Sequence, residues 1–258
     1  RTDSIGDVVL TLPVAKVLKD NYPQIKIGFI AKAYTQPVIE ACIYIDEFID
    51  VEDFLGKRPV IIPDVIIHVF PKKIIARRAK QLKIPLRIGT TNRIYHWLTC
   101  NKLVKLSRKK SSLHESQLNL KLLQGLGITR DFSLTEISNY FGMQRLKKLE
   151  ERFSNLIEKD NFNIILHPKS QGSGREWPME NFINLINSLD TDLYKIFISG
   201  TQKEREEMQL IFDAVGAKVT DITGVMDLYQ FISFINQANA LVASGTGPLH
   251  IAGALGKN

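Results

Sequence analysis

The chain of 258 residues has only two cysteines, Cys42 and Cys100, and its apolar runs fall short of the roughly 20 residues that a membrane-spanning helix requires. Two cysteines this far apart exclude a disulfide framework and a cysteine-based zinc site. Apolar residues make up 44% and charged residues 24% of the sequence, which is typical of a globular protein. We therefore expect a globular protein in a reducing, cytoplasmic setting.

Acidic residues are absent between positions 65 and 114, although this span holds 13 lysines and arginines. The formal net charge of +7 arises in the first part of the chain, since residues 1–150 carry 25 basic and 14 acidic side chains, against 9 and 13 in residues 151–258. Such a positive field attracts nucleic acid, phospholipid headgroups or phosphorylated substrates. The alternative interpretation is a solvated basic face.

Apolar, strand-like segments alternate with helical patterns, most regularly after residue 160. The strand-like segments occupy 26–31, 64–70, 162–167, 194–200 and 240–244. The helical patterns occupy 116–127, 179–189, 203–216, 227–238 and 248–256. This alternation predicts parallel βαβ units. A polar, charged segment over 143–160 predicts a helix that leads to a boundary between two α/β halves.

Ligands of parallel sheets bind at the carboxyl ends of the strands, so the loops that follow strands are the places to look for chemistry. The segment SGTGPLH, at 244–250, follows one strand and opens a helix at Pro248. Its glycines allow close approach of the backbone, and free N–H groups there favour an anion. A dinucleotide fingerprint would have a third glycine where His250 stands, and no phosphate-binding G-x4-G-K-[ST] loop is present. The alternative is an ordinary tight turn.

The segment HPKSQGSGREWP, at 167–178, leaves another strand and carries Lys169, Ser170 and Arg175. An arginine binds phosphate with two parallel hydrogen bonds, while a lysine offers a point charge. Alone, the segment is equally typical of a surface loop. Together with the turn at 244–250 in the same sheet, it predicts a shared phosphate site.

Two carboxylates have two interpretations each. Glu204 lies just past a strand and near the start of a helix, where it suits ribose hydroxyls or simply the helix dipole. Asp7 follows Gly6 at the start of a helix that Pro13 kinks or restarts. A carboxylate there caps the helix or serves as a general base.

No metal site is predicted. The D-x-D pattern of residues 190–192 falls at the amino end of a strand, the wrong end for a ligand, so we interpret it as a loop. His68 and His114 are too scattered to indicate metal binding.

Four segments together resemble glycosyltransferase family 9, the ADP-heptose:lipopolysaccharide heptosyltransferases: RTDSIGDVVLTLP, HPKSQGSGREWPMENFINLI, ISGTQKERE and LVASGTGPLHIAGALGK. The segments LKIPLRIG and HESQLNLKLL are similar to intervening blocks of the family. The resemblance runs in order from Arg1 to Asn258. It implies a further strand before the first and further helices after the last of these residues, so we expect both termini to be truncated.

The resemblance implies an α/β fold of the GT-B type, in which two Rossmann-like domains with parallel sheets face each other across a cleft. Residues 1–155 would bind the acceptor. Residues 156–258, incomplete at the carboxyl end, would bind the nucleotide-sugar. The implied reaction is inverting transfer of a heptose or related sugar from an ADP-sugar to a lipopolysaccharide core or lipid A-type acceptor, with no cofactor and no metal.

The resemblance also implies roles for single residues. Asp7 matches the catalytic aspartate, which acts as general base, and Arg175 matches the basic residue that stabilises the departing diphosphate. The donor-binding positions are Lys169, Ser170, Thr246 and Gly247 at the phosphates, Glu204 at the ribose, Met226 at the adenine, and His250. The acceptor-binding positions are Arg1, Ser4 and Gly6. Some members carry an acidic residue where this chain has Gly245, and there it positions the donor sugar, so the resemblance does not identify that sugar.

Arg1 and the basic span 65–114 suit a phosphorylated glycolipid acceptor at the cytoplasmic face of the inner membrane. We therefore expect peripheral contact with an anionic membrane surface and no nucleic-acid partner. Two alternatives stay open: a sugar-nucleotide epimerase or hydrolase of the same fold, which would need no acceptor, and a non-catalytic nucleotide- or anionic-lipid-binding module.

Overall fold

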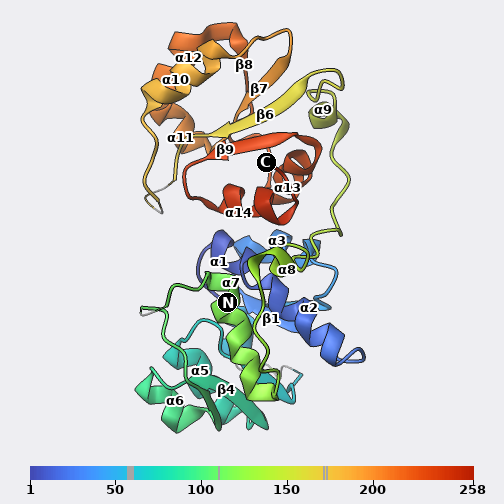
Figure 1. The fold of residues 1–258 in the computed structure, drawn as a ribbon, viewed down its shortest axis with the longest axis vertical. Helices are drawn as coiled ribbons and strands as arrows, with labels where there is room; N and C mark the ends of the chain where they lie inside the picture. The colour runs from blue at the N-terminus through green and yellow to red at the C-terminus, as the bar shows by residue number, and fades with distance from the viewer. Residues whose placement is uncertain (57–60, 110, 171, 173) are drawn as a thin grey trace. The chain divides into compact units, whose positions relative to one another are not determined.

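Parallel β-sheets form the framework of the chain, whose computed structural model describes residues 1–56, 61–109, 111–170, 172 and 174–258 (Figure 1). The residues group into two units, Arg1–Gln144 and Arg145–Asn258. The sequence placed the division after residue 155, whereas the structure groups residues 145–155 with the second unit. The acceptor and donor roles of the two units stay predictions.

In the described part of the first unit, five strands form one sheet of two and one sheet of three, and the strands of each sheet run parallel. The strands are β1 (Gly28–Ala31), β2 (Glu47–Asp50), β3 (Val65–Ile67), β4 (Leu86–Thr90) and β5 (Lys102–Val104). The helices described in this unit, with η for a 3₁₀ helix, are α1 (Ile5–Val9), α2 (Leu12–Asn21), η1 (Ala33–Thr35), α3 (Gln36–Ala41), α4 (Val51–Leu55), α5 (Lys73–Gln81), α6 (Ile94–Thr99), α7 (Glu115–Lys121), η2 (Leu122–Leu126) and α8 (Leu134–Ile137).

The start of the first unit follows the sequence prediction. Ser4 caps α1. The helix is interrupted after α1 and restarts as α2, where Pro13 takes one of the first two helical positions. A proline is tolerated there because the first helical N–H groups have no partner within the helix. The predicted helix over 116–127 is α7 continued by η2, and it ends at Gly127, whose φ of +85° suits glycine.

The second unit contains one four-stranded parallel sheet with the order β8-β7-β6-β9. Its strands are β6 (Phe162–His167), β7 (Tyr194–Ile198), β8 (Val219–Asp221) and β9 (Ala240–Ala243). Its described helices are α9 (Glu151–Ser154), α10 (Met179–Ser188), α11 (Gln202–Glu207), α12 (Gln209–Val215), η3 (Gly216–Lys218), α13 (Leu228–Gln237) and α14 (Gly247–Ala254). In chain order the strands lie 3-2-1-4, which is the Rossmann arrangement.

Helices cover both faces of this sheet, as Figure 1 shows. On one face, Ile164 of β6 and Ile196 of β7 pack with Phe182 of α10. On the other face, Phe197 of β7 makes an edge-to-face contact with Phe234 of α13, with ring centroids 5.0 Å apart. Because successive residues of a strand point to opposite faces, both sets of side chains are apolar, which explains the continuous apolar runs in the sequence.

The prediction of a helix over 143–160 is wrong, because only the short helix α9 forms there. The preceding segment instead bonds to α13. Ser233 donates its hydroxyl to the Lys147 carbonyl at 2.7 Å, and the backbone N–H of Glu150 donates to Gln230 Oε1 at 2.8 Å. Tertiary contacts therefore override the helix propensity of this charged segment.

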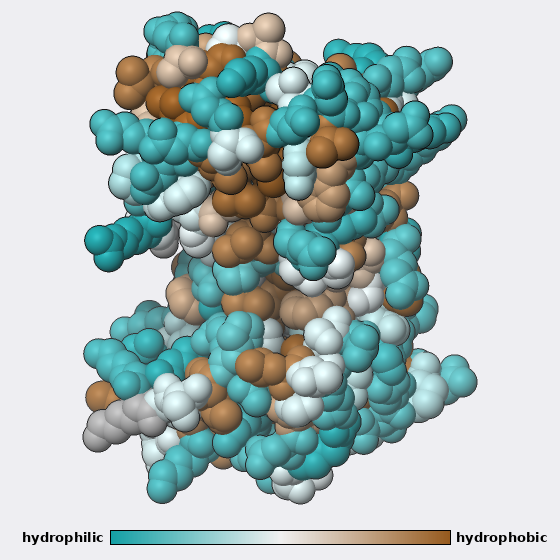
Figure 2. Space-filling model, turned by 45° about the horizontal axis from the view of Figure 1, so that its top comes forward, coloured by the Kyte–Doolittle hydropathy of each residue, from teal (hydrophilic) through white to brown (hydrophobic). Residues whose placement is uncertain are grey.

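The surface is mainly hydrophilic on the face shown in Figure 2, with hydrophobic residues exposed in patches between hydrophilic ones. Among the helices of the described ranges, none combines the length and the apolar character needed to cross a bilayer.

Candidate active site

The predicted donor-binding residues gather at one edge of the second unit's sheet. Lys169, Ser170 and Arg175 follow β6, whereas Glu204 follows β7 and Met226 follows β8. The remaining three, Thr246, Gly247 and His250, follow β9 at the start of α14. All four strands are parallel, so these loops share the carboxyl edge of the sheet. The strand order reverses between β6 and β9, and such a switch point is where doubly wound sheets bind ligands.

The loop after β6 and the turn after β9 contact each other directly, which confirms that these two loops lie together. The backbone N–H of Trp177 donates to Ser244 Oγ at 3.2 Å. A Cβ atom added to Gly174 would lie 2.8 Å from the carbonyl oxygen of Gly245, too close for any side chain. Glycine at position 174 is thus required by the close approach of the two backbones.

Lys169 and Ser170 form a cradle that already holds one carboxylate. Glu176 accepts hydrogen bonds from Lys169 Nζ (2.8 Å), from the backbone N–H of Ser170 (2.8 Å) and from Ser170 Oγ (3.0 Å). The hydrogen bond with Glu176 raises the pKa of Lys169, with a smaller contribution from Glu207 at 3.1 Å. The same lysine lowers the pKa of Glu176. An ammonium, a hydroxyl and an amide aimed at one anion are suited to a phosphate group.

Thr246 adds an unsatisfied donor next to this cradle. Its Oγ1 is buried and has no hydrogen-bond partner in the described part of the chain, although the residue stands at the N-cap of α14. Buried hydroxyls in native proteins are nearly always paired, so this atom is available for a ligand, and its contact with the donor stays a prediction. The start of α14 adds free backbone N–H groups to the same place.

Glu204 is used as a helix cap in the structure. Its backbone N–H donates to Thr201 Oγ1 at 3.3 Å, and its Oε2 accepts from the Thr201 N–H at 2.7 Å, which is the reciprocal capping box. The structure therefore shows the buried Glu204 carboxylate stabilising the start of α11. Its contact with the ribose of the donor stays a prediction. Arg175 is exposed and Met226 partly exposed, so both side chains are accessible.

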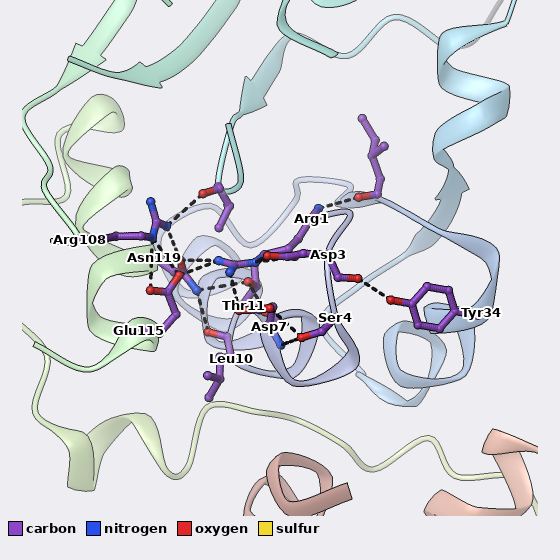
Figure 3. A network of polar contacts seen from close by, with 12 residues as sticks. Arg1, Asp3, Ser4, Asp7, Leu10, Thr11, Tyr34, Arg108, Glu115 and Asn119 are labelled. Atoms are coloured by element: carbon purple, nitrogen blue, oxygen red, sulfur yellow. Dashed lines mark hydrogen bonds and ion pairs between the residues drawn. The ribbon is translucent and has the colours of Figure 1, made fainter. Parts of the chain in front are cut away.

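Asp7 is held by side chains in the first unit. Ser4 Oγ donates to its Oδ2 at 2.7 Å, and Arg1 Nη2 donates to its Oδ1 at 2.6 Å (Figure 3). The cap of α1 is Ser4, whose hydroxyl accepts from the Asp7 N–H, so the carboxylate itself is not the cap. The role of Asp7 as a general base stays a prediction.

The Arg1 guanidinium is the centre of this network. It also donates to Asp3 at 2.8 Å, to Glu115 at 2.7 Å and to Asn119 at 3.2 Å, and its side chain is only 5% exposed (Figure 3). Arg108 donates to the same Glu115 and to Asn119. Arg1, predicted to bind the acceptor, thus directs its guanidinium at carboxylates in the structure, and contact with the acceptor stays a prediction. The same holds for Ser4 and Gly6.

The network keeps Asp7 ionised. Partial burial raises its pKa, but the hydrogen bond from Ser4 and the positive charge of Arg1 together outweigh burial, so the pKa of Asp7 lies below its usual value. Burial has the larger effect at Asp3, whose pKa is raised. At neutral pH Asp7 is therefore an ionised carboxylate.

Sequence reasoning missed Glu115, Asn119 and Arg108. Glu115 and Asn119 are four residues apart and so lie on one face of α7, where Asn119 is fully buried. The amide of Asn119, a polar side chain within an apolar helical pattern, was the signal in the sequence that could have indicated a buried polar contact. Their partners at the start of the chain, Arg1 and Leu10, lie more than 100 residues away, and no local pattern identifies them.

The other sequence predictions concern metal and the D-x-D pattern. In the described ranges, no three His, Cys, Asp or Glu side chains are grouped so that they could hold a metal ion. Asp190 accepts the N–H of Asp192 at 2.9 Å in the turn before β7, so its interpretation as a loop is confirmed.

The parallel sheets of the two units define an α/β protein whose second unit is of the doubly wound, Rossmann-like class. The model of glycosyltransferase family 9 (heptosyltransferase) matches residues 76–258, more than half of the chain. The chain belongs to this family and is a glycosyltransferase, as the resemblance of its motifs indicated.

Known relatives cover nearly the whole chain. It is 22% identical to lipopolysaccharide heptosyltransferase 3 of Escherichia coli (strain K12), over 97% of this chain and 77% of that protein. It is similar to the crystal structure of a family 9 glycosyl transferase from Veillonella parvula DSM 2008, with a TM-score of 0.79, 21% identity, and coverage of 99% of this chain and 77% of that one. It is also similar to E. coli heptosyltransferase WaaC with ADP-2-deoxy-2-fluoro heptose, with a TM-score of 0.74, 17% identity, and coverage of 99% and 84%. These likenesses confirm the predicted GT-B type of α/β fold.

Proposed function

We propose that this glycosyltransferase moves a heptose or a related sugar from an ADP-sugar to a lipopolysaccharide core or lipid A-type acceptor, with inversion at the anomeric carbon. The observation that carries the proposal is the Asp7 carboxylate, which Ser4 and Arg1 fix and keep ionised. Of the relatives, one is named a lipopolysaccharide heptosyltransferase and one is a heptosyltransferase with an ADP-heptose analogue.

In the proposed reaction, a hydroxyl oxygen of the acceptor attacks the anomeric carbon of the donor sugar. Its proton passes to Asp7, and the bond from the anomeric carbon to the diphosphate breaks, so that ADP leaves with the bonding electron pair. Attack from the face opposite the leaving group inverts the configuration. A general base that is correctly placed contributes about 10²–10⁴-fold to such a rate.

The donor would bind at the carboxyl edge of the second unit's sheet. Lys169, Ser170, Thr246 and the N–H of Gly247 would bind the diphosphate. Arg175 would stabilise its charge on departure, since preorganised donors aimed at developing charge contribute strongly to catalysis. Glu204 would hold the ribose, Met226 would pack on the adenine, and His250 would complete the donor site. With these cationic and N–H groups at the phosphates, we expect no metal requirement and no other cofactor.

The acceptor would approach the first unit, near Arg1, Ser4 and Gly6. Its phosphate groups suit the basic span 65–114, which carries no acidic residue. We place the enzyme in the cytoplasm, in peripheral contact with the anionic cytoplasmic face of the inner membrane. We expect no nucleic-acid partner.

A product assay tests the proposal. The protein is incubated with a panel of ADP-sugars and with extracted lipid acceptors that lack the outer sugars, and the products are read by mass spectrometry. We expect a mass increase of one sugar on the acceptor, with ADP released in equal amount. Turnover of the ADP-sugar without acceptor would instead support the epimerase or hydrolase. Binding of ADP with no turnover of any donor would support a non-catalytic module.

A further inference from the structure

Helix α6 turns its apolar face toward solvent. Ile94, Trp97 and Leu98 are 85%, 62% and 70% exposed, and their spacing of three and four residues places them on one side of the helix. His96 and Thr99, on the opposite side, are buried. A surface helix of a globular protein normally has the reverse arrangement, with apolar residues inward. Three neighbouring large apolar side chains in solvent indicate a contact surface.

A basic helix lies beside this face. Helices α5 and α6 pack side by side in the first unit, and Lys80 Nζ of α5 donates to the Leu98 carbonyl at 2.8 Å (Figure 1). The exposed side of α5 carries Lys73 and Arg77 around Ile74, which is 60% exposed. Both helices fall within the span 65–114, so no acidic residue of that span offsets these charges.

The chemistry of this surface selects its partner. A second copy of the same face would bring two sets of cations together, and the repulsion would oppose a symmetric dimer. An anionic bilayer satisfies both features, because apolar side chains enter the boundary between headgroups and acyl chains while lysine and arginine bind the phosphates. Tryptophan is also favoured at this boundary, since its ring is apolar and its N–H is polar.

We propose that α6 inserts the side chains of Ile94, Trp97 and Leu98 into the surface of an anionic phospholipid bilayer, and that Lys73, Arg77 and Lys80 of α5 bind its headgroups. The proposal rests on the membrane contact of the proposed function and names the element that makes it. The first unit thereby meets its lipid-embedded acceptor on a surface rather than in bulk solution.

Trp97 is itself the reporter. The chain has two tryptophans, Trp97 and Trp177, so Trp177→Phe leaves one. This variant is titrated with vesicles of phosphatidylglycerol and phosphatidylethanolamine, and in parallel with pure phosphatidylcholine vesicles. We expect the Trp97 emission to shift to shorter wavelength only with the anionic vesicles, and to be quenched by lipids brominated in the acyl chain. Added salt should weaken this binding, because it screens the headgroup contacts.

Two double variants, each made in the single-tryptophan protein, distinguish insertion of α6 from non-specific binding by exposed apolar side chains. Ile94→Ser with Leu98→Ser should weaken vesicle binding by about tenfold or more, because it removes two exposed apolar side chains from the contact. The matched control is Leu193→Ser with Leu210→Ser in the second unit, where the leucines are 61% and 59% exposed. The control should bind vesicles like the parent. Thermal unfolding of both variants verifies that each is folded.

Specific results would overturn the proposal. They are vesicle binding with no shift of Trp97 emission, equal loss of binding in the control, or no binding to anionic vesicles at all. A Trp97 shift that depends on protein concentration without lipid, with sedimentation showing a dimer, would assign the surface to a second copy instead. Calorimetry with ADP on the unsubstituted protein, which retains Trp177 in the donor loop, keeps the two proposals apart. Failure to bind ADP counts against the proposed function, whereas the vesicle data alone decide the role of α6.

Discussion

Arg1 and Asp7 are joined by an ion pair in which Nη2 lies 2.6 Å from Oδ1, and the same guanidinium also binds Glu115 of α7. The position of the proposed base therefore depends on a helix far along the chain. The Arg1 side chain is 5% exposed and that of Asp7 is 33% exposed, so water screens the pair in part.

Replacing Asp7 by asparagine should remove turnover and spare the donor site. The amide keeps the size of the side chain but cannot take up the proton, so we expect kcat to fall by about 10²–10⁴-fold. Calorimetry should find ADP affinity within a factor of about two of the parent, as the predicted phosphate contacts lie in the second unit. Full activity of Asp7→Asn would rule out its role as the base.

Replacing Arg1 by glutamine should shift the pH dependence of the enzyme. Arg1 lowers the pKa of Asp7, whose ordinary value is 3.8, so its loss moves the acidic limb of the kcat/KM profile to higher pH. The sign for stability follows from the same shift. A carboxylate with a lowered pKa stabilises the fold above its unfolded pKa, and this stabilisation is lost as pH falls through the folded value.

The same Arg1→Gln variant leaves Asp3, Asp7 and Glu115 close together without their shared cation. Because these carboxylates are partly exposed, we expect a loss of stability smaller than the roughly 3–5 kcal/mol typical of a broken buried pair. Urea unfolding at pH 7 measures it. Arg1→Lys should restore part of both effects, since it returns the charge without the fork geometry. An unchanged pH profile would mean that Arg1 does not tune Asp7.

Much of the second unit's fold, and the meeting of the loops that carry its candidate site, could be predicted from the sequence because the signals are local. The strand β6 occupies the predicted residues 162–167, since a buried parallel strand must be apolar on both faces. The parallel-sheet rule then placed the loops after β6 and β9 at one edge, and Gly174 shows how closely they meet. The same rule placed Lys169 and Ser170 at this edge, because they follow β6 directly in the sequence.

Long-range contacts set the limit of that reasoning. The segment before α9 has good helix formers, yet it bonds to α13, about 80 residues further along. Similarly, Glu115 meets Arg1 across 114 residues of chain. A single sequence contains the residues of such contacts but no signal for their pairing.

Replacing Glu176 by glutamine should strengthen ADP binding. Its carboxylate occupies Lys169 Nζ and both donors of Ser170, which are the groups that we assign to the diphosphate. Removing this competing charge should raise ADP affinity by about two- to fivefold, in keeping with the modest energy of a partly exposed ion pair. The matched control is Glu207→Gln, which also loses a pair with Lys169 but does not touch Ser170 and should have a smaller effect. Weaker ADP binding in Glu176→Gln would mean that the carboxylate holds the cradle in shape.

Removing the hydroxyl of Thr246 should change the affinity for ADP without lowering the stability of the fold. Thr246→Val removes a buried Oγ1 with no hydrogen-bond partner in the described residues, so the fold loses no bond and its stability should stay the same or rise slightly. If the hydroxyl donates to the diphosphate, ADP should bind about tenfold or more weakly, because hydrogen bonds to charged groups are strong.

Thr223→Val is the contrasting variant, since Thr223 is also buried but donates its hydroxyl to Asp221 at 2.6 Å. It should lower stability by about 1 kcal/mol, because a hydrogen bond is broken. Thermal unfolding and calorimetry with ADP measure both quantities for each variant. Loss of stability in Thr246→Val would show that its hydroxyl serves the fold, and unchanged ADP affinity would remove Thr246 from the donor site. The proposal thus requires the two threonines to respond in opposite ways, one in affinity and the other in stability.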